Sequence, residues 1–113
     1  MGLMGSRMTT RLLAAGYQVW VWNRSPNKCL PLVAQGATLA ANVATIAQQC
    51  DVIMLCLSDT VAVESAVFGE HGLANHLKNG QLVVDFSSIT PDATRDFAMR
   101  LQAQKVHWID SPV

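Results

Sequence analysis

The sequence predicts an α/β fold, with an open, doubly wound parallel sheet and helices on both of its faces. Three observations support this fold class. Helix-like and strand-like segments alternate along the whole chain. The segments at 51–57 and 81–85 are nearly continuous in apolar residues, which is typical of parallel strands covered on both faces. Two expected helices open with Ser-Pro and Thr-Pro, at 25–26 and 90–91.

A first helix is expected over residues 3–15. Its apolar residues recur at helical spacing and form one face: Met4, Met8, Leu12 and Ala15. Gly16 ends this helix. The run of β-branched and aromatic residues at 18–22 (QVWVW) then predicts a strand, with its tryptophans in the core.

A second helix is expected over residues 26–35. Ser25 is a candidate N-cap, and Pro26 takes the first helical position, where its missing N–H is not needed. Gly36 ends the helix, and a short strand at 37–38 follows.

The second half of the chain repeats the alternation. Helices are expected at 42–50, 60–68 and 91–104, and strands at 51–57, 81–85 and 106–110. Thr90 is the expected cap of the last helix, with Pro91 at its first position. Asp85 and Asp110 end strands, where each is expected to cap or orient the following loop. Right-handed crossovers would place all the strands in one sheet.

The composition limits what the chain can do. It has 113 residues, of which 50% are hydrophobic and 14% charged, with eight basic and eight acidic side chains. A single domain is therefore expected, and neither a disordered tail nor a basic nucleic-acid surface. The apolar runs are far shorter than the roughly 20 residues of a membrane span. Three irregularly spaced cysteines and the lack of a secretory signal favour a cytoplasmic protein.

A glycine motif at the N-terminus indicates phosphate binding. Gly2-Leu3-Met4-Gly5 opens the first helix and matches the second half of a G-x-G-x-x-G fingerprint. Taken alone, four such residues are better explained by a simple helix start. The spacing adds support, because Asn23 and Arg24 follow Gly5 by 18 and 19 positions. A residue that contacts the adenosine ribose is expected about 20 positions on.

The residues at that point favour NADP(H) over NAD(H). An acidic side chain would hydrogen-bond the ribose 2′-hydroxyl and repel a 2′-phosphate, whereas Arg24 can hold a phosphate with paired donors. Two alternatives stay open: Arg24 is an ordinary solvated loop residue, and Ser25 only caps the helix.

Several motifs together resemble the β-hydroxyacid dehydrogenases, in the family's order and spacing. They lie at 2–5 (GLMG), 21–25 (VWNRS), 51–54 (DVIM), 57–59 (LSD), 69–72 (GEHG), 85–91 (DFSSITP) and 110–113 (DSPV). The family includes 3-hydroxyisobutyrate dehydrogenase, tartronate semialdehyde reductase, and the glyoxylate and succinic semialdehyde reductases. The resemblance implies a Rossmann-like fold and hydride exchange between a nicotinamide and a short aldehyde acid or hydroxy acid.

The resemblance also implies roles for individual residues. Those expected to bind the cofactor are Gly2, Leu3, Met4, Gly5, Asn23, Arg24, Ser25, Leu57, Ser58 and Ser88. Those expected at the substrate are Ser88, Asp110, Ser111, Pro112 and Val113. Ser111 stands where the family's D-A-P-V-S-G-G loop has alanine.

Other family features have no counterpart in these 113 residues. They are the first strand, the catalytic lysine and the helical second domain, through which family members commonly form homo-oligomers. Lys78 and Lys105 do not fit the lysine's role, since one lies in a turn and the other at a helix end. We therefore expect residues 1–113 to be a partial cofactor domain, cut at both ends and inactive alone. The alternatives are a non-catalytic nucleotide-binding or oligomerising module, or a domain for another adenine cofactor.

The first strand is central in a sheet of order 3-2-1-4-5-6. Without it, the strands at 18–22 and 51–57 lose their shared neighbour. We expect rearrangement, a strand from another chain or upstream residues to close the gap.

Overall fold

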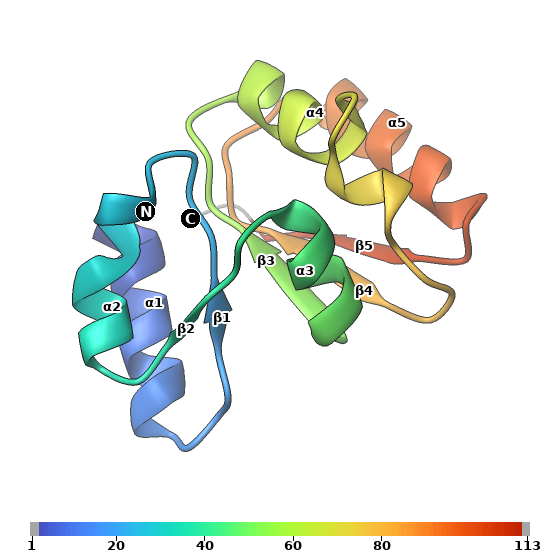
Figure 1. Cartoon of the computed structure of the whole chain (residues 1–113). Coiled ribbons are helices and arrows are strands. Elements are labelled where there is room, and N and C mark those ends of the chain that lie inside the picture. Colours follow the sequence, from blue (N-terminus) through green and yellow to red (C-terminus); the bar gives the residue numbers. More distant parts are fainter. Residues whose placement is uncertain (1–2, 112–113) are drawn as a thin grey trace.

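Residues 3–111, which the computed structural model describes, form the predicted α/β fold (Figure 1). The α-helices are α1 (Leu3–Ala14), α2 (Leu30–Ala34), α3 (Val43–Gln49), α4 (Thr60–Phe68) and α5 (Pro91–Gln102). Two short 3₁₀ helices are η1 (Pro26–Cys29) and η2 (Leu73–Asn75). The strands are β1 (Trp20–Val21), β2 (Thr38–Leu39), β3 (Val52–Leu55), β4 (Leu82–Asp85) and β5 (His107–Asp110). No helix in this range is long and apolar enough to cross a membrane.

The strands form two parallel sheets rather than one. β1 pairs with β2, and β4 lies between β3 and β5. Within residues 3–111, β1 and β3 do not pair with each other. Because Val19 and Val21 direct their carbonyls to β2, the backbone groups of Trp20 point to the opposite, open edge of the strand. A rearrangement of the described strands therefore does not close the gap between β1 and β3. Closure by a strand from another chain or by upstream residues stays a prediction.

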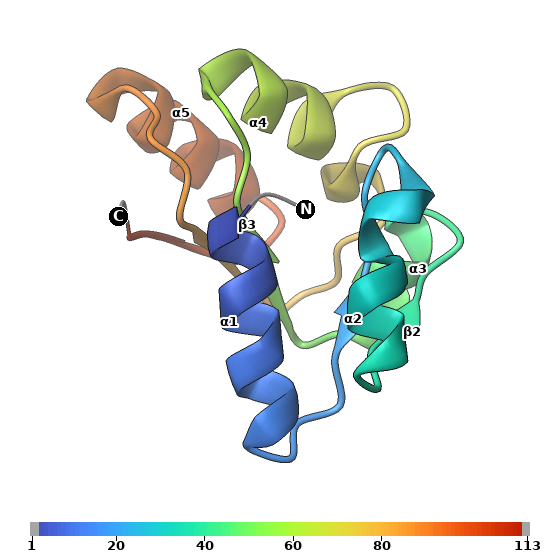
Figure 2. The same cartoon turned by 90° about the vertical axis from the view of Figure 1, so that its left-hand side faces the viewer.

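Each sheet has its own apolar core. Beside β1 and β2, Val21 packs with Cys29, Leu32 and Ala37, and Leu13 of α1 lies against this cluster. The larger core lies between β3–β5 and the helices α3, α4 and α5, and includes Ile53, Val83, Phe97 and Leu101. Figures 1 and 2 show α1 and α2 together on the small sheet, with α4 and α5 beside each other on the large one. The gap in the strand order thus falls between the two cores.

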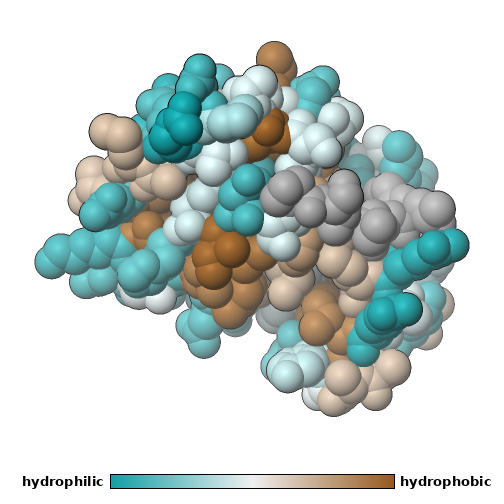
Figure 3. All heavy atoms as spheres, turned by 180° about the vertical axis from the view of Figure 1, so that it is seen from behind, coloured by the Kyte–Doolittle hydropathy of each residue, from teal (hydrophilic) through white to brown (hydrophobic). Residues whose placement is uncertain are grey.

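Only one face of the large sheet is fully covered by the described residues. Ile53 and Val83 point to α3–α5 and are buried, whereas Val52, Met54 and Ile109 alternate to the other face and are 45–48% exposed. Figure 3, seen from behind, shows apolar side chains at the surface. The expectation that both faces are covered is wrong for residues 3–111.

The second predicted helix is split in two. Pro31 has no N–H for an α-helical hydrogen bond, so the segment begins as η1 and becomes α-helical only at Leu30. Ser25 occupies the N-cap position but makes no side-chain cap, which corrects its predicted role. Trp22 is also not a core residue, because it is 37% exposed beyond the end of β1.

Three of the other helices have a side-chain N-cap. Asn42, Asp59 and Thr90 accept the backbone N–H of the residue three positions on, at the starts of α3, α4 and α5. The predicted cap Thr90 is confirmed. Each of these caps lies just after a strand or its loop, so each also orients the chain that leaves the sheet.

Candidate functional site

Most of the described candidate residues lie in loops that follow the carboxyl ends of the strands, and the others lie in the first turn of α1 and at the end of β5. Because neighbouring strands are parallel, these ends meet at one edge of each sheet, where open α/β sheets bind ligands. Figures 1 and 2 show the first turn of α1 at the same end of the molecule as the loops after β1 and β3. This end is called the carboxyl edge below.

A local hydrogen bond shapes the turn after β1. The Asn23 Oδ1 accepts the backbone N–H of Ser25 at 3.0 Å, which closes a turn around Arg24. Arg24 is exposed, and it forms no ion pair with the described residues. Since Ser25 makes no cap, capping does not account for its hydroxyl. The turn thus carries two consecutive exposed residues, one with a guanidinium and one with a hydroxyl.

The start of α1 brings backbone donors to the carboxyl edge. Leu3 and Met4 are the first helical residues, and Gly5 is buried in the first turn. The Thr9 hydroxyl donates to the carbonyl oxygen of Gly5 at 2.8 Å. The first N–H groups of a helix have no partner within it and attract anions. Gly2 lies outside the described residues.

The loops after β3 and β4 contain both exposed and buried residues. Leu57, Ser58 and Ser88 are exposed, whereas Ser87 is only 3% exposed. The backbone N–H of Leu57 donates to the Ser87 Oγ at 2.7 Å. A side chain after one strand therefore holds the loop after its neighbour, with the candidate residues facing outward.

Asp85, at the end of β4, is fully buried. Its Oδ1 accepts the backbone N–H of Ser87 at 2.9 Å, so it orients the following loop, as predicted. Its Oδ2 has no hydrogen-bond partner among the described residues. Burial raises the pKa of Asp85, and the nearby Asp110 carboxylate adds to the rise, while hydrogen bonds from the Ser87 side chain and backbone oppose it.

The candidate substrate segment follows β5. Asp110 is exposed, and the Ser111 N–H donates to the backbone carbonyl of Asp85 at 2.8 Å. Pro112 and Val113 lie outside the described residues. The link that the buried residues Asp85 and Ser87 make between loops could not be predicted from the sequence, because the pairing of Ser87 with Leu57 depends on strand order.

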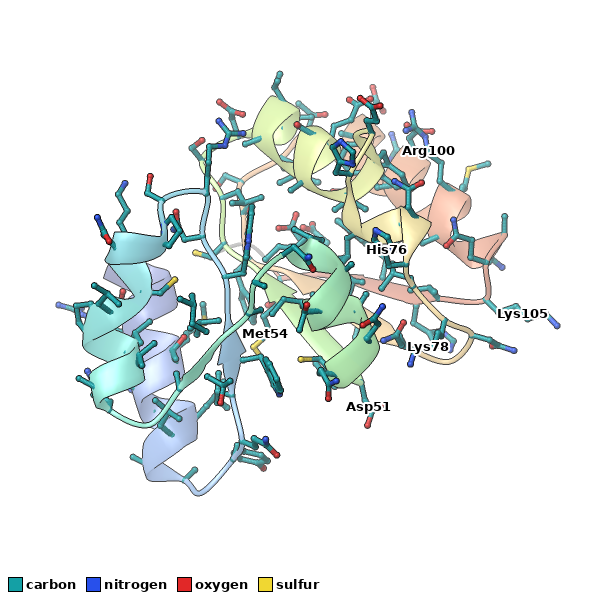
Figure 4. All side chains as sticks on the ribbon, in the orientation of Figure 1. Asp51, Met54, His76, Lys78, Arg100 and Lys105 are labelled. Atoms are coloured by element: carbon teal, nitrogen blue, oxygen red, sulfur yellow. The ribbon has the colours of Figure 1, made fainter. Side chains whose placement is uncertain are left out.

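Among the described residues, neither Lys78 nor Lys105 lies at the carboxyl edge, and no metal site is found there. Lys78 and Lys105 lie at the opposite end of the large sheet, where Figure 4 shows both pointing outward. The Lys78 Nζ donates to the carbonyl of Gln48 at 3.4 Å. Within residues 3–111, no cluster of three potential metal ligands occurs. The donors at the carboxyl edge are therefore a guanidinium, hydroxyls and helix N–H groups, which suit phosphates and ribose hydroxyls.

Comparisons with known proteins identify a relationship along the whole chain. The family model for the NAD-binding domain of 6-phosphogluconate dehydrogenase matches residues 1–113. The human (Homo sapiens) cytokine-like nuclear factor N-PAC is 32% identical over 113 residues, which is 100% of this chain and 20% of N-PAC. The glyoxylate/succinic semialdehyde reductase 1 of Arabidopsis thaliana is 29% identical over 113 residues, which is 39% of that protein.

A solved structure is similar in fold as well. Psf3 in complex with NADP⁺ and 2-OPP matches with a TM-score of 0.91 at 30% identity, over 95% of this chain and 38% of Psf3. The chain thus spans 20% to 39% of the length of these relatives.

Proposed function

The chain belongs to the family of the NAD-binding domain of 6-phosphogluconate dehydrogenase, and from this membership we propose that it is the cofactor-binding part of an NADP-dependent β-hydroxyacid dehydrogenase or reductase. The family consists of oxidoreductases with a Rossmann fold, and the reductase resemblance seen in the motifs is supported by the Arabidopsis relative. The proposed reaction is the reduction of a short aldehyde acid or the oxidation of a 3-hydroxy acid.

The preference for NADP(H) rests on Arg24. Its exposed guanidinium, free of any ion pair among residues 3–111, lies on a turn closed by Asn23 at the end of β1. Asn23, Arg24 and Ser25 would hold the adenosine 2′-phosphate, which a guanidinium binds through paired hydrogen bonds. The solved relative Psf3, which binds NADP⁺, supports the assignment.

The rest of the cofactor would follow the carboxyl edge. Gly2 and the first residues of α1, Leu3 to Gly5, would receive the pyrophosphate on backbone N–H groups, with Leu57 and Ser58 beside the dinucleotide. Ser88 would face the nicotinamide ribose and the edge of the substrate pocket, which Asp110 to Val113 would continue. When bound, the nicotinamide supplies or accepts the hydride.

Titration of the chain with NADPH and NADH tests this proposal. The expected result is saturable binding of NADPH and binding of NADH weaker by about tenfold or more, the loss expected for one charged hydrogen-bonding partner. Equal affinities would overturn the NADP preference. Binding of neither nucleotide would overturn the proposed function.

We propose further that residues 1–113 do not carry out the reaction alone. The chain spans 20% to 39% of the length of these relatives. In this proposal, the general acid or base and the second domain would lie outside these residues. A strand between β1 and β3, from outside residues 3–111, would complete the sheet. NADPH-dependent reduction of glyoxylate or succinic semialdehyde by residues 1–113 would contradict this.

A second candidate function is a non-catalytic nucleotide-binding or oligomerising module. It is favoured by the N-PAC relative, which is named as a nuclear factor and matches this chain from end to end. Both candidates place the same residues at the carboxyl edge. They differ in the longer protein: the enzyme turns over a short aldehyde acid with NADPH, and the module binds NADPH without turnover.

The expected partners are a small-molecule substrate in the longer protein and a second copy of the chain in a homo-oligomer. Nucleic acid and membranes are not proposed as partners, since eight basic side chains balance eight acidic ones. A cytoplasmic location suits the three cysteines, all of them free thiols.

A further inference from the structure

Asp85 and Ser87 connect three loops of the carboxyl edge. The Asp85 carboxylate accepts the backbone N–H of Ser87 at 2.9 Å, and the Ser87 Oγ accepts the backbone N–H of Leu57 at 2.7 Å. The backbone carbonyl of Asp85 accepts the N–H of Ser111 at 2.8 Å. These bonds join the loop after β4 to the loops after β3 and β5.

We propose that Asp85 and Ser87 are positioning residues that align these three loops with the nicotinamide half of the dinucleotide. The inference rests on the proposed function, because it needs a dinucleotide at this edge. Neither residue is placed in contact with the cofactor. Both act through the residues that they hold, which are Leu57, Ser58 and Ser88.

Burial separates the positioning residues from the binding residues. Asp85 is 0% and Ser87 3% exposed, whereas Leu57, Ser58 and Ser88 are exposed. Removal of the Ser87 hydroxyl would leave the N–H of Leu57 without its partner, and the loop would shift to regain a hydrogen bond to water. A displacement of this kind affects ligand affinity strongly, because binding groups need to be held within a fraction of an ångström.

The adenosine side of the site is built independently. The turn around Arg24 is closed by its own hydrogen bond from the Ser25 N–H to Asn23, on the smaller sheet with the separate core of Val21 and Leu32. None of the bonds made by Asp85 and Ser87 reaches this turn. Loss of the link should therefore weaken contacts to the nicotinamide half and spare those to the adenosine 2′-phosphate.

Two ligands distinguish these halves. NADPH spans the whole site, and adenosine 2′,5′-bisphosphate carries only the adenosine half. In Ser87→Ala, the dissociation constant for NADPH should rise about tenfold, as expected for one lost hydrogen bond that leaves a donor unpaired. The dissociation constant for adenosine 2′,5′-bisphosphate should stay within about twofold, well below the change expected for a lost contact.

Ser65→Ala is the matched control, because Ser65 is an exposed hydroxyl residue on α4 away from this edge. It should change neither dissociation constant. A global loss of folding in Ser87→Ala would lower the affinity for both ligands together. An equal loss of affinity for both ligands, or no loss of affinity for NADPH, therefore overturns the inference while leaving the proposed function intact. Failure of the unmodified chain to bind NADPH overturns the proposed function itself, and the inference with it.

Hydrogen exchange of the unmodified chain provides a test that requires no variant. The Leu57 amide should exchange at least about tenfold more slowly than the Ser58 amide after correction for intrinsic rates, because only the former donates to a buried hydroxyl. Equal protection factors at the two amides would show that the link is not maintained in solution, and would overturn the inference.

Discussion

The Asn23 Oδ1 accepts the backbone N–H of Ser25 at 3.0 Å, and Arg24 lies in the turn that this bond closes. The bond holds the turn in one conformation before any ligand arrives. A guanidinium on an ordered turn loses less conformational freedom on binding a phosphate than one on a flexible loop. The affinity for a 2′-phosphate should therefore depend on Arg24 through its charge and on Asn23 through the turn that it closes.

Replacement of Arg24 tests whether its positive charge binds the adenosine 2′-phosphate. Arg24→Ala should raise the dissociation constant for NADPH by about tenfold or more, because a charged hydrogen-bonding partner is lost, and should leave that for NADH nearly unchanged. The two constants can be measured by fluorescence or calorimetric titration. Arg95→Ala on α5 removes an exposed arginine that pairs with Asp92, and serves as the control. An equal loss for both nucleotides would refute the assignment of Arg24.

Replacement of Asn23 by aspartate tests the sign of the charge at the same turn. Asn23→Asp keeps the oxygen that accepts the Ser25 N–H but adds a carboxylate, which repels a 2′-phosphate and can bind a ribose 2′-hydroxyl. NADPH should bind more weakly, while NADH binding holds or improves. Asn79→Asp adds the same charge at the exposed turn before β4, so its titrations show the effect of net charge alone. Tighter NADPH binding by Asn23→Asp would contradict the account.

The buried carboxylate predicts a dependence of stability on pH. Burial raises the pKa of Asp85 in the folded chain above its ordinary value of 3.8, so between these two pKa values the folded state holds more protons than the unfolded state. The contribution of Asp85 to stability is therefore complete below pH 3.8 and is lost as the pH rises through the raised pKa. Asp85→Asn removes this titration and keeps an acceptor for Ser87.

Urea denaturation of both proteins over a range of pH measures this effect. The free energy of unfolding of the unmodified chain, relative to that of Asp85→Asn, should fall as the pH rises above 3.8 and then become constant. A rise of this difference with pH would mean that the folded state favours the ionised carboxylate, against the account.

The packing of α5 against the large sheet predicts that two substitutions in this helix differ in their effect on the free energy of unfolding. Leu101 is fully buried on α5, and Met99, two residues earlier, is 70% exposed. Leu101→Ala should lower the free energy of unfolding by about 2–5 kcal/mol, since it leaves a cavity. Met99→Ala should change it by less than about 0.5 kcal/mol. Chemical denaturation measures both, and similar losses would show that α5 packs on a different face.

Local patterns predicted most of the elements. The two apolar runs became β3 and β4, the segment at 106–110 became β5, and Thr90 with Pro91 begins α5 as expected. The break at Pro31 was missed because Ser25, Pro26 and Gly36 suggested one continuous helix, although a second proline lies inside that segment. The core position of Trp22 was also wrong, since strand composition does not show where the two-residue strand β1 ends.

The candidate site could be predicted in part. Residues at strand ends could be recognised from the sequence, and Asn23, Leu57, Ser58 and Ser88 do lie in such loops. The link from Ser87 to Leu57 could not, because it joins residues 30 positions apart and depends on which strands are neighbours. The lack of pairing between β1 and β3 follows from the expected strand order, in which another strand lies between them. The exposed face around Met54 does not follow from the apolar pattern of β3.

The most direct test of a dinucleotide site at the carboxyl edge is to map the backbone amide chemical shifts of the chain as NADPH is added. The largest changes should fall in residues 23–25, 57–58 and 87–88, and amides at the opposite edge, such as those of Gln48, Lys78 and Gly80, should change little. Changes centred on that opposite edge, or spread evenly over the chain, would contradict it.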